Sequence, residues 1–359
     1  MAWRFRPFGR ASAAPHATPS AARRAPSPSA QPRSLGGARV ADDALVARFW
    51  GVRGSYPAPH VGGGVVGGET TCLEVRSGRH TLIIDAGSGA IGLGEALASR
   101  ANATPDQRQD VTLLLTHAHH DHLCGLPFFA PLYDPRFHVR FFGPDLANLR
   151  FSEIIAGYMR APYFPVDFHS LPSRRTLRSL GDGDRLLIPA EGEPQIIDAS
   201  ASFSASSSTS APEGALQVDA LFSRLHPANG TMVYRVSAGA ARLVFATDVE
   251  IGACSAEADQ RLVEFARGAD TLIHDAQYSE EDYNGAESKR GFGHSTPAMA
   301  VRIARDAGVN RLVLFHHDPH YSDDAVMELQ RRAQVGFPQV VTAREGLELR
   351  LDGARQRLV

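Results

Sequence analysis

Short apolar runs recur along the middle of the chain and alternate with amphipathic stretches. The runs are three to five residues long, too short to be helices, and such runs are typical of buried strands. They occupy residues 81–84, 111–115, 243–245, 271–273 and 312–315. This spacing predicts a β-sheet whose strands are separated by other elements along the chain.

Helix signals lie between and after these runs. Thr296 can cap a helix, Pro297 suits its first turn and Gly308 suits its end. A second amphipathic helix is predicted from Asp323 to about Ala333. Strands that alternate with helices predict an α/β fold.

A histidine or an aspartate follows each of the five apolar runs. These residues are Asp85, His117, Asp248, His274 with Asp275, and His316 with His317. Ligand-binding groups in α/β folds gather at the ends of the strands. The pattern therefore predicts a polar site along one edge of a sheet.

The run at 111–115 leads into the densest cluster, which contains His117, His119, Asp121 and His122. In an extended strand His117 and His119 share one face, and a tight turn brings Asp121 and His122 back toward them. Imidazole and carboxylate groups so close together suit a pair of divalent ions about 3.5–4 Å apart. We therefore expect a metal site here.

Composition narrows the class of protein. With 359 residues, of which 43% are hydrophobic and 21% charged, the chain can bury a core. Three cysteines are too few for a disulfide framework, and no apolar stretch reaches the roughly 18–20 residues of a membrane span. We therefore expect no membrane association.

Charge divides the chain into two parts. Residues 1–40 hold seven arginines and no acid, which leaves 30 basic against 39 acidic residues in the remainder. Residues 1–44, rich in Ala, Arg, Ser and Pro, are expected to be a disordered tail or an organellar transit peptide. We expect a cytoplasmic protein, or an organellar one if this tail is a transit peptide. The acidic remainder disfavours long nucleic acids as partners.

The spacing His117-x-His119-x-Asp121-His122 resembles the metallo-β-lactamase superfamily. The resemblance continues in family order through residues 82–87, 225–227, 245–248 and 312–316. Two further stretches, 272–276 and the Gly-His-Ser-Thr segment at 293–296, resemble the ribonuclease Z and cyclic-phosphodiesterase branch.

The resemblance implies an αββα four-layer sandwich with a dinuclear metal site at the sheet edge. Residues 45–359 would form this one hydrolase domain, with a low-complexity loop near 199–214. One ion would be held by His117, His119 and His226, the second by Asp121, His122 and His316, and both by Asp248. His317 remains an alternative to His316. Zinc suits these ligands, and manganese and iron are alternatives.

The expected function is a metal-dependent hydrolase, foremost a phosphodiesterase that uses a metal-bridging hydroxide on a small or cyclic phosphodiester. Asp121 and His294 are the expected catalytic residues, His294 as proton donor to the leaving group. The alternatives are an RNA-processing endonuclease of the ribonuclease Z type and a hydrolase of thioesters, lactones or lactams. The expected partner is a small phosphodiester, and a homodimer is compatible with this function.

Several other residues have two interpretations each. Asp85, His274 and Asp275 either orient ligands or are ordinary polar residues at strand ends. Arg53 either contacts phosphate or forms a structural ion pair. The aromatic stretch 151–165 either forms a lid over a base or another apolar group or packs in the core.

Overall fold

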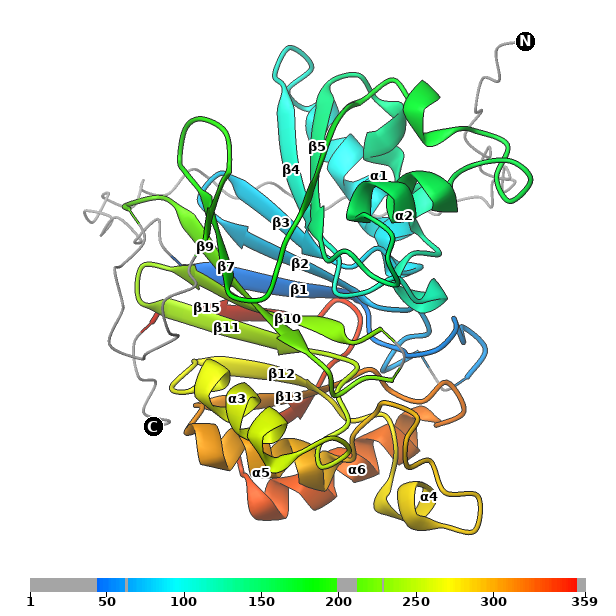
Figure 1. The fold of residues 1–359 in the computed structure, drawn as a ribbon, viewed down its shortest axis with the longest axis vertical. Coiled ribbons are helices and arrows are strands. Elements are labelled where there is room, and N and C mark those ends of the chain that lie inside the picture. Colours follow the sequence, from blue (N-terminus) through cyan, green and yellow to red (C-terminus); the bar gives the residue numbers. More distant parts are fainter. Residues whose placement is uncertain (1–43, 62–63, 199–211, 228, 354–359) are drawn as a thin grey trace, which may run out of the picture. The chain divides into compact units, whose positions relative to one another are not determined.

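The computed structural model describes residues 44–61, 64–198, 212–227 and 229–353. In this part of the chain two β-sheets lie face to face, with α-helices on their outer faces (Figure 1). The predicted αββα sandwich is confirmed. The tail expected at 1–44 lies, apart from Ala44, outside the described residues, and so does most of the low-complexity segment 199–214.

The first sheet has seven strands, and its β3 to β6 run parallel to one another. In spatial order the strands are β15 (Glu348–Leu351), β1 (Leu45–Gly51), β2 (Cys72–Ser77), β3 (His80–Ile84), β4 (Gln109–Leu114), β5 (Phe137–Gly143) and β6 (Arg174–Ser179). Helix α1 (Gly89–Asn102) connects β3 to β4, and α2 (Phe151–Tyr158) follows β5. Because β3 and β4 are parallel, their carboxyl ends lie at the same edge of the sheet.

The second sheet has eight strands, of which β11 to β14 are parallel. In spatial order they are β14 (Val340–Thr342), β13 (Arg311–Phe315), β12 (Thr271–Asp275), β11 (Ala241–Ala246), β10 (Thr231–Ala238), β9 (Leu216–Ser223), β7 (Asp184–Ile188) and β8 (Gln195–Asp198). The helices that follow in the chain are α3 (Ala256–Ala266), α4 (Glu280–Asn284), α5 (Pro297–Ala307) and α6 (Asp323–Gly336). Helices α3, α5 and α6 cover the outer face of this sheet (Figure 1).

All five apolar runs form strands, namely β3, β4, β11, β12 and β13. His274 and Asp275 belong to β12 itself, whereas the sequence placed them after it. Helix α5 has the predicted ends, because the Thr296 side chain caps its first turn and Gly308 ends it in the left-handed conformation. Helix α6 extends to Gly336, beyond its expected end near Ala333.

The strands are apolar on both faces because each sheet is buried on both sides. In β13, Val313 and Phe315 face the core between the sheets, whereas Leu312 and Leu314 face the helices. In β3 the core between the sheets holds Leu82 and Ile84, and Ile83 faces the outer helices. This double burial explains why the runs show no polar alternation. In the described part of the chain, no helix has the length and apolar character needed to span a bilayer.

Arg53 is a structural residue and does not line the site as a phosphate ligand. Its buried guanidinium donates hydrogen bonds to the carbonyl oxygens of Gly67 at 2.8 Å, Asp318 at 2.9 Å and Tyr321 at 2.8 Å. The carboxylate of Asp323 lies 3.7 Å away. Arg53 therefore ties the segment after β1 to the loop between β13 and α6.

We expect Arg53→Ala to lower the free energy of unfolding by about 3–5 kcal/mol, because three part-buried carbonyls and the buried carboxylate of Asp323 lose their partner. Arg331→Ala is the control, since its side chain is exposed and pairs only at the surface with Glu328. That change should cost under about 1 kcal/mol. Urea titration measures both, and equal losses would contradict the anchoring role of Arg53.

Candidate metal centre

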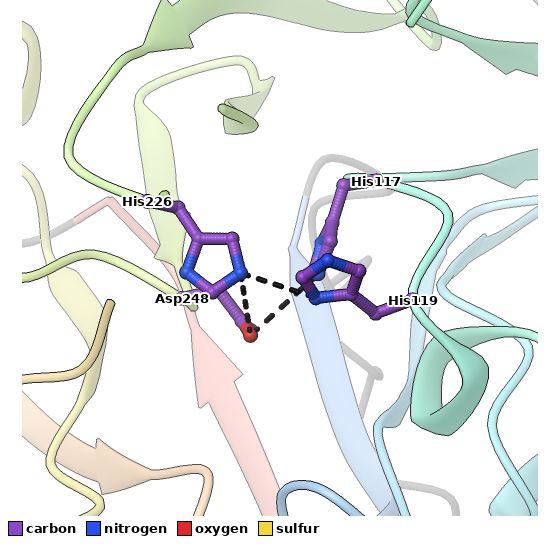
Figure 2. Close-up of side chains that lie close together, drawn as sticks. All are labelled: His117, His119, His226 and Asp248. Atoms are coloured by element: carbon purple, nitrogen blue, oxygen red, sulfur yellow. Dashed lines mark hydrogen bonds and ion pairs between the residues drawn. The ribbon is translucent and has the colours of Figure 1, made fainter. Parts of the chain in front are cut away.

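Loops from both sheets meet at one edge of the sandwich. His117 and His119 follow β4 of the first sheet, and Figure 2 shows them facing His226 and Asp248, which follow β9 and β11 of the second. The ligand atoms of these four residues lie within 4.8 Å of one another. The ligand atoms of a second group, Asp121, His122 and His316, also lie within 4.8 Å of one another. All seven predicted ligands are thus brought together.

Asp248 lies between the two groups and faces each with a different oxygen. Its Oδ1 is 3.6 Å from His117 Nε2 and 3.9 Å from His226 Nε2. Its Oδ2 is 3.2 Å from His122 Nε2 and 3.4 Å from His316 Nε2. This carboxylate can therefore serve two ions at once.

Asp85 at the end of β3 orients two of the histidines. Its buried carboxylate accepts hydrogen bonds from His122 Nδ1 at 2.8 Å and from the Thr116 hydroxyl at 2.8 Å. The Thr116 oxygen lies 3.1 Å from His117 Nδ1 and, having donated its proton to Asp85, accepts one from this ring. When these rings are neutral, as metal binding requires, both imidazoles direct an unprotonated Nε2 toward the centre.

Two partners of the second sheet orient His316 and His226 in the same way. The side-chain oxygen of Gln277 lies 2.9 Å from His316 Nδ1, and the carbonyl of Gly293 lies 3.1 Å from His226 Nδ1. Because an oxygen of this kind only accepts, each Nδ1 carries the proton. The Nε2 atom of His226 lies 3.1 Å from His119 Nδ1, and that of His316 lies 3.1 Å from Asp121 Oδ2. In the neutral rings these Nε2 atoms can bind a cation in place of those contacts.

The residues present fit divalent metal ions. Within the described part of the chain, the buried Nε2 atoms of His117 and His122 have no hydrogen-bond partner. Burial lowers the pKa of His117 well below its ordinary value, which favours the neutral form that binds metals. Lone pairs and two carboxylates that face one another repel unless positive charge lies between them. Nitrogen and oxygen donors in this proportion suit zinc.

The backbone is strained where strands deliver groups to the centre. Asp85, Asp248 and His316 have φ angles of 64°, 55° and 63°, in the left-handed region that residues with a side chain seldom adopt. Each such residue costs on the order of 1–3 kcal/mol, and such strain clusters at functional sites. The left-handed turn at the end of each strand thus directs these side chains toward the centre.

His294 lies beside the bridging carboxylate, just before α5. Its Nδ1 is 2.8 Å from Asp275 Oδ2 and 4.0 Å from Asp248 Oδ1, and its ring stacks on that of His316. Burial disfavours its charged form, but the Asp275 carboxylate outweighs this and raises the pKa of His294 to about 9. Asp275 also accepts from the backbone of Asp248 at 3.1 Å, so it holds both residues in place.

Other candidates lie outside the cluster. The His317 ring bonds the carbonyl of Ala343 at 3.1 Å, so the geometry favours His316 over His317. His120 is exposed and pairs with Tyr158. His274 Nδ1 lies 2.7 Å from the backbone carbonyl of Asp275. Among the described residues, the His274 ring forms no hydrogen bond with a predicted metal ligand.

Glu250 is a site residue that the sequence analysis missed. Its buried carboxylate accepts hydrogen bonds from Tyr283 Oη and Gly291 N, both at 2.7 Å, and from Gly293 N at 2.8 Å. It thereby holds the loop whose Gly293 carbonyl orients His226. Gly293 has a φ of 91°, and a Cβ there would lie 2.2 Å from His226 Nδ1, so the loop requires glycine. The Gly293-His294 pair was the only hint of this loop in the sequence.

Comparison with known proteins gives the family. Residues 80–317 match the family model described as the β-lactamase superfamily domain, and the chain belongs to this family. Together with the fold and the side-chain cluster, this membership makes the protein a metal-dependent hydrolase.

Two curated relatives are named ribonuclease Z. The protein from Thermoplasma volcanium is 41% identical over 75 residues, which are 21% of this chain and 24% of that protein. The protein from Gemmatimonas aurantiaca is 42% identical over 86 residues, which are 24% of this chain and 26% of that protein. The chain thus matches about a quarter of the length of these relatives.

Two solved structures show the same fold. The metallo-β-lactamase fold protein YhfI from Bacillus subtilis has a TM-score of 0.56 at 19% identity, over 86% of this chain and 99% of that one. A diphosphatase from the PhnP family has a TM-score of 0.53 at 15% identity, over 85% of this chain and 97% of that one. At these identities the likeness extends to the architecture alone.

We expect the purified protein to bind two divalent ions per chain, as measured by plasma mass spectrometry. His316→Ala should lose one ion, and Asp248→Asn should weaken both sites, because only Asp248 faces both groups. His60→Ala, an exposed histidine outside the cluster, should keep both ions. Retention of two tightly held ions by Asp248→Asn would rule out the bridging role.

We expect Glu250→Gln to weaken the affinity for one of the two ions by about 10–100-fold, the usual effect of removing an outer partner of a ligand. The affected site should be the one that includes His226, whose orientation depends on the Gly293 carbonyl. Competition with a fluorescent chelator measures both affinities. Glu257→Gln, an exposed change in α3, is the matched control, and an effect of equal size there would contradict the prediction.

Proposed function

We propose that the protein is a phosphodiesterase acting on a small or cyclic phosphodiester. The ions would be held by His117, His119, Asp121, His122, His226, Asp248 and His316. When bound, two divalent ions supply stabilisation of charge on the phosphate oxygens and lower the pKa of an attacking water.

The His294–Asp275 pair is the observation that carries this proposal. Asp275 accepts a hydrogen bond from Nδ1 of His294 and so fixes the ring beside Asp248. The other ring nitrogen is then the atom that carries a proton to the departing oxygen. An alkoxide that leaves phosphorus needs such a proton, because it is a strong base.

Asp121 has a positioning part in this proposal. One of its oxygens, Oδ2, lies 3.1 Å from His316 Nε2 and also accepts a hydrogen bond from the backbone N–H of Ser55 at 2.8 Å. The neighbouring histidines hold the pKa of this carboxyl well below its usual range despite its burial. Asp121 is therefore an anion that attracts a cation and fixes the loop that bears it.

Two further observations support phosphoryl chemistry on a small substrate. The relatives with local identity are named ribonuclease Z, and a protein of the same fold is a diphosphatase, so phosphorus–oxygen bond chemistry occurs among similar proteins. Beyond residue 40 the chain has 39 acidic against 30 basic residues, which disfavours a long polyanion. An RNA-processing endonuclease is the second candidate, favoured by the same two relatives.

A substrate panel separates these activities. The account predicts faster turnover of a cyclic nucleotide or bis(p-nitrophenyl) phosphate than of a thioester, a lactone or a lactam. Higher kcat/KM on a thioester or lactone would contradict it. Cleavage of a precursor tRNA in preference to every small phosphodiester would establish the second candidate instead.

We expect His294→Ala to lower kcat for a cyclic nucleotide by about 10²–10⁴-fold, because its alkoxide leaving group needs a general acid. The loss on bis(p-nitrophenyl) phosphate should be under about tenfold, since nitrophenoxide departs without a proton. Metal content is measured on the same samples to show that the centre is intact. Equal losses on the two substrates, or no loss on either, would exclude His294 as the proton donor.

A further inference from the structure

A large cavity lies between the metal-binding loop and the segment around α2. Its volume is about 1150 Å³. We call it the α2 cavity and define it by six of its lining residues, which are Phe128, Leu149, Tyr158, Arg160, Tyr163 and Phe164. Such a volume holds a nucleotide-sized group with room for water.

The α2 cavity lies beside the loops that carry the metal ligands. Its walls include Ala118 and His120, which alternate in the chain with the ligands of the loop after β4. Asn229, which lies just beyond His226 in the chain, lines it too. The cavity and the metal centre therefore share the loop after β4 and the segment after β9 as walls.

The cavity wall includes aromatic side chains that are exposed and do not pack in the hydrophobic core. Phe128 and Tyr163 have exposed fractions of 54% and 79%, whereas Phe151 and Ile155 of α2 are buried. Phe164 meets Phe128 edge to face, with ring centroids 5.8 Å apart. Exposed aromatic rings gathered in a concave wall are typical of a surface that stacks on a flat ligand.

The polar groups of the α2 cavity suit a neutral ligand with hydrogen-bonding edges. Among the described residues, the guanidinium of Arg160 has no hydrogen bond or ion pair. Tyr158, whose pKa burial raises to about 12, stays protonated and donates to His120 Nδ1 at 2.9 Å. Two acids of the wall, Glu153 and Asp167, already accept from backbone N–H groups. One free cation beside two engaged acids does not favour a further phosphate here.

We propose that the α2 cavity binds the nucleobase of a nucleoside phosphodiester whose phosphate lies at the metal centre. This inference rests on the proposed phosphodiesterase function and names its substrate class. Stacking against Phe128 and Tyr163 supplies affinity for any base, and Arg160 and the Tyr158–His120 pair face its polar edge. An aliphatic group on the phosphate, in place of a nucleoside, would form neither the stacking contact nor the polar contacts.

Two substrates with the same reacting ring isolate the contribution of the base. Adenosine 2′,3′-cyclic phosphate and glycerol 1,2-cyclic phosphate both contain a five-membered cyclic phosphodiester, but only the first has a base. The wild-type protein should have the higher kcat/KM on the nucleotide. In the double variant Phe128→Ala, Tyr163→Ala the ratio of the two values should fall at least about fivefold, through KM of the nucleotide.

Phe292→Ala is the matched control. Phe292 is as exposed as Phe128, at 55%, but it lines a separate cavity with Tyr278 and Lys289. The ratio should stay at its wild-type value in this variant. A fall in Phe292→Ala with none in the double variant would place the base in that other cavity and overturn the proposal.

A binding measurement keeps this inference separate from the proposed function. Calorimetry with adenosine monophosphate and with ribose 5-phosphate should show tighter binding of the nucleotide by the wild-type protein, and a reduced difference in the double variant. If that preference is found but neither cyclic phosphate is hydrolysed, the base site stands and the phosphodiesterase proposal fails. If the wild-type protein prefers the nucleotide in neither binding nor turnover, the base site is overturned.

Discussion

The repulsion among converging lone pairs is the constraint on which this structure depends. The rings of His117, His122, His226 and His316 each commit Nδ1 to an oxygen acceptor, so each neutral ring presents the lone pair of Nε2 to the same small space. The carboxylate of Asp248 lies among them. Without positive charge this arrangement is unfavourable, and divalent cations turn the same contacts into bonds. The fold has to keep these groups close together, and bound cations would add to its stability.

The two-sheet architecture provides this closeness. Each sheet has a set of parallel strands, and loops from both sets reach the same edge of the sandwich. Left-handed turns at Asp85, Asp248 and His316 aim the side chains inward. Arg53 binds the segment after β1 to the loop that follows β13, which begins with His316. The strain in the turns is tolerated because a buried strand precedes each of them and holds it.

The parts of the site that follow a buried strand could be predicted from the sequence, because the apolar run and the polar residue after it are neighbours in the chain. The same holds for α5, whose caps are local. Glu250 and Gln277 could not be predicted, since their roles depend on which distant loop packs against them. Arg53 had two interpretations until its burial decided between them. The α2 cavity could not be predicted either, because the sequence does not show which aromatic residues are exposed and which are buried.

Anomalous X-ray diffraction from crystals of the metal-loaded protein would locate the cations. We expect two peaks at the metal absorption edge, one on the Oδ1 side of Asp248 among His117, His119 and His226, and one on its Oδ2 side with His122 and His316. A single peak, or peaks away from these side chains, would show that the imidazole nitrogens do not converge to hold a pair of cations.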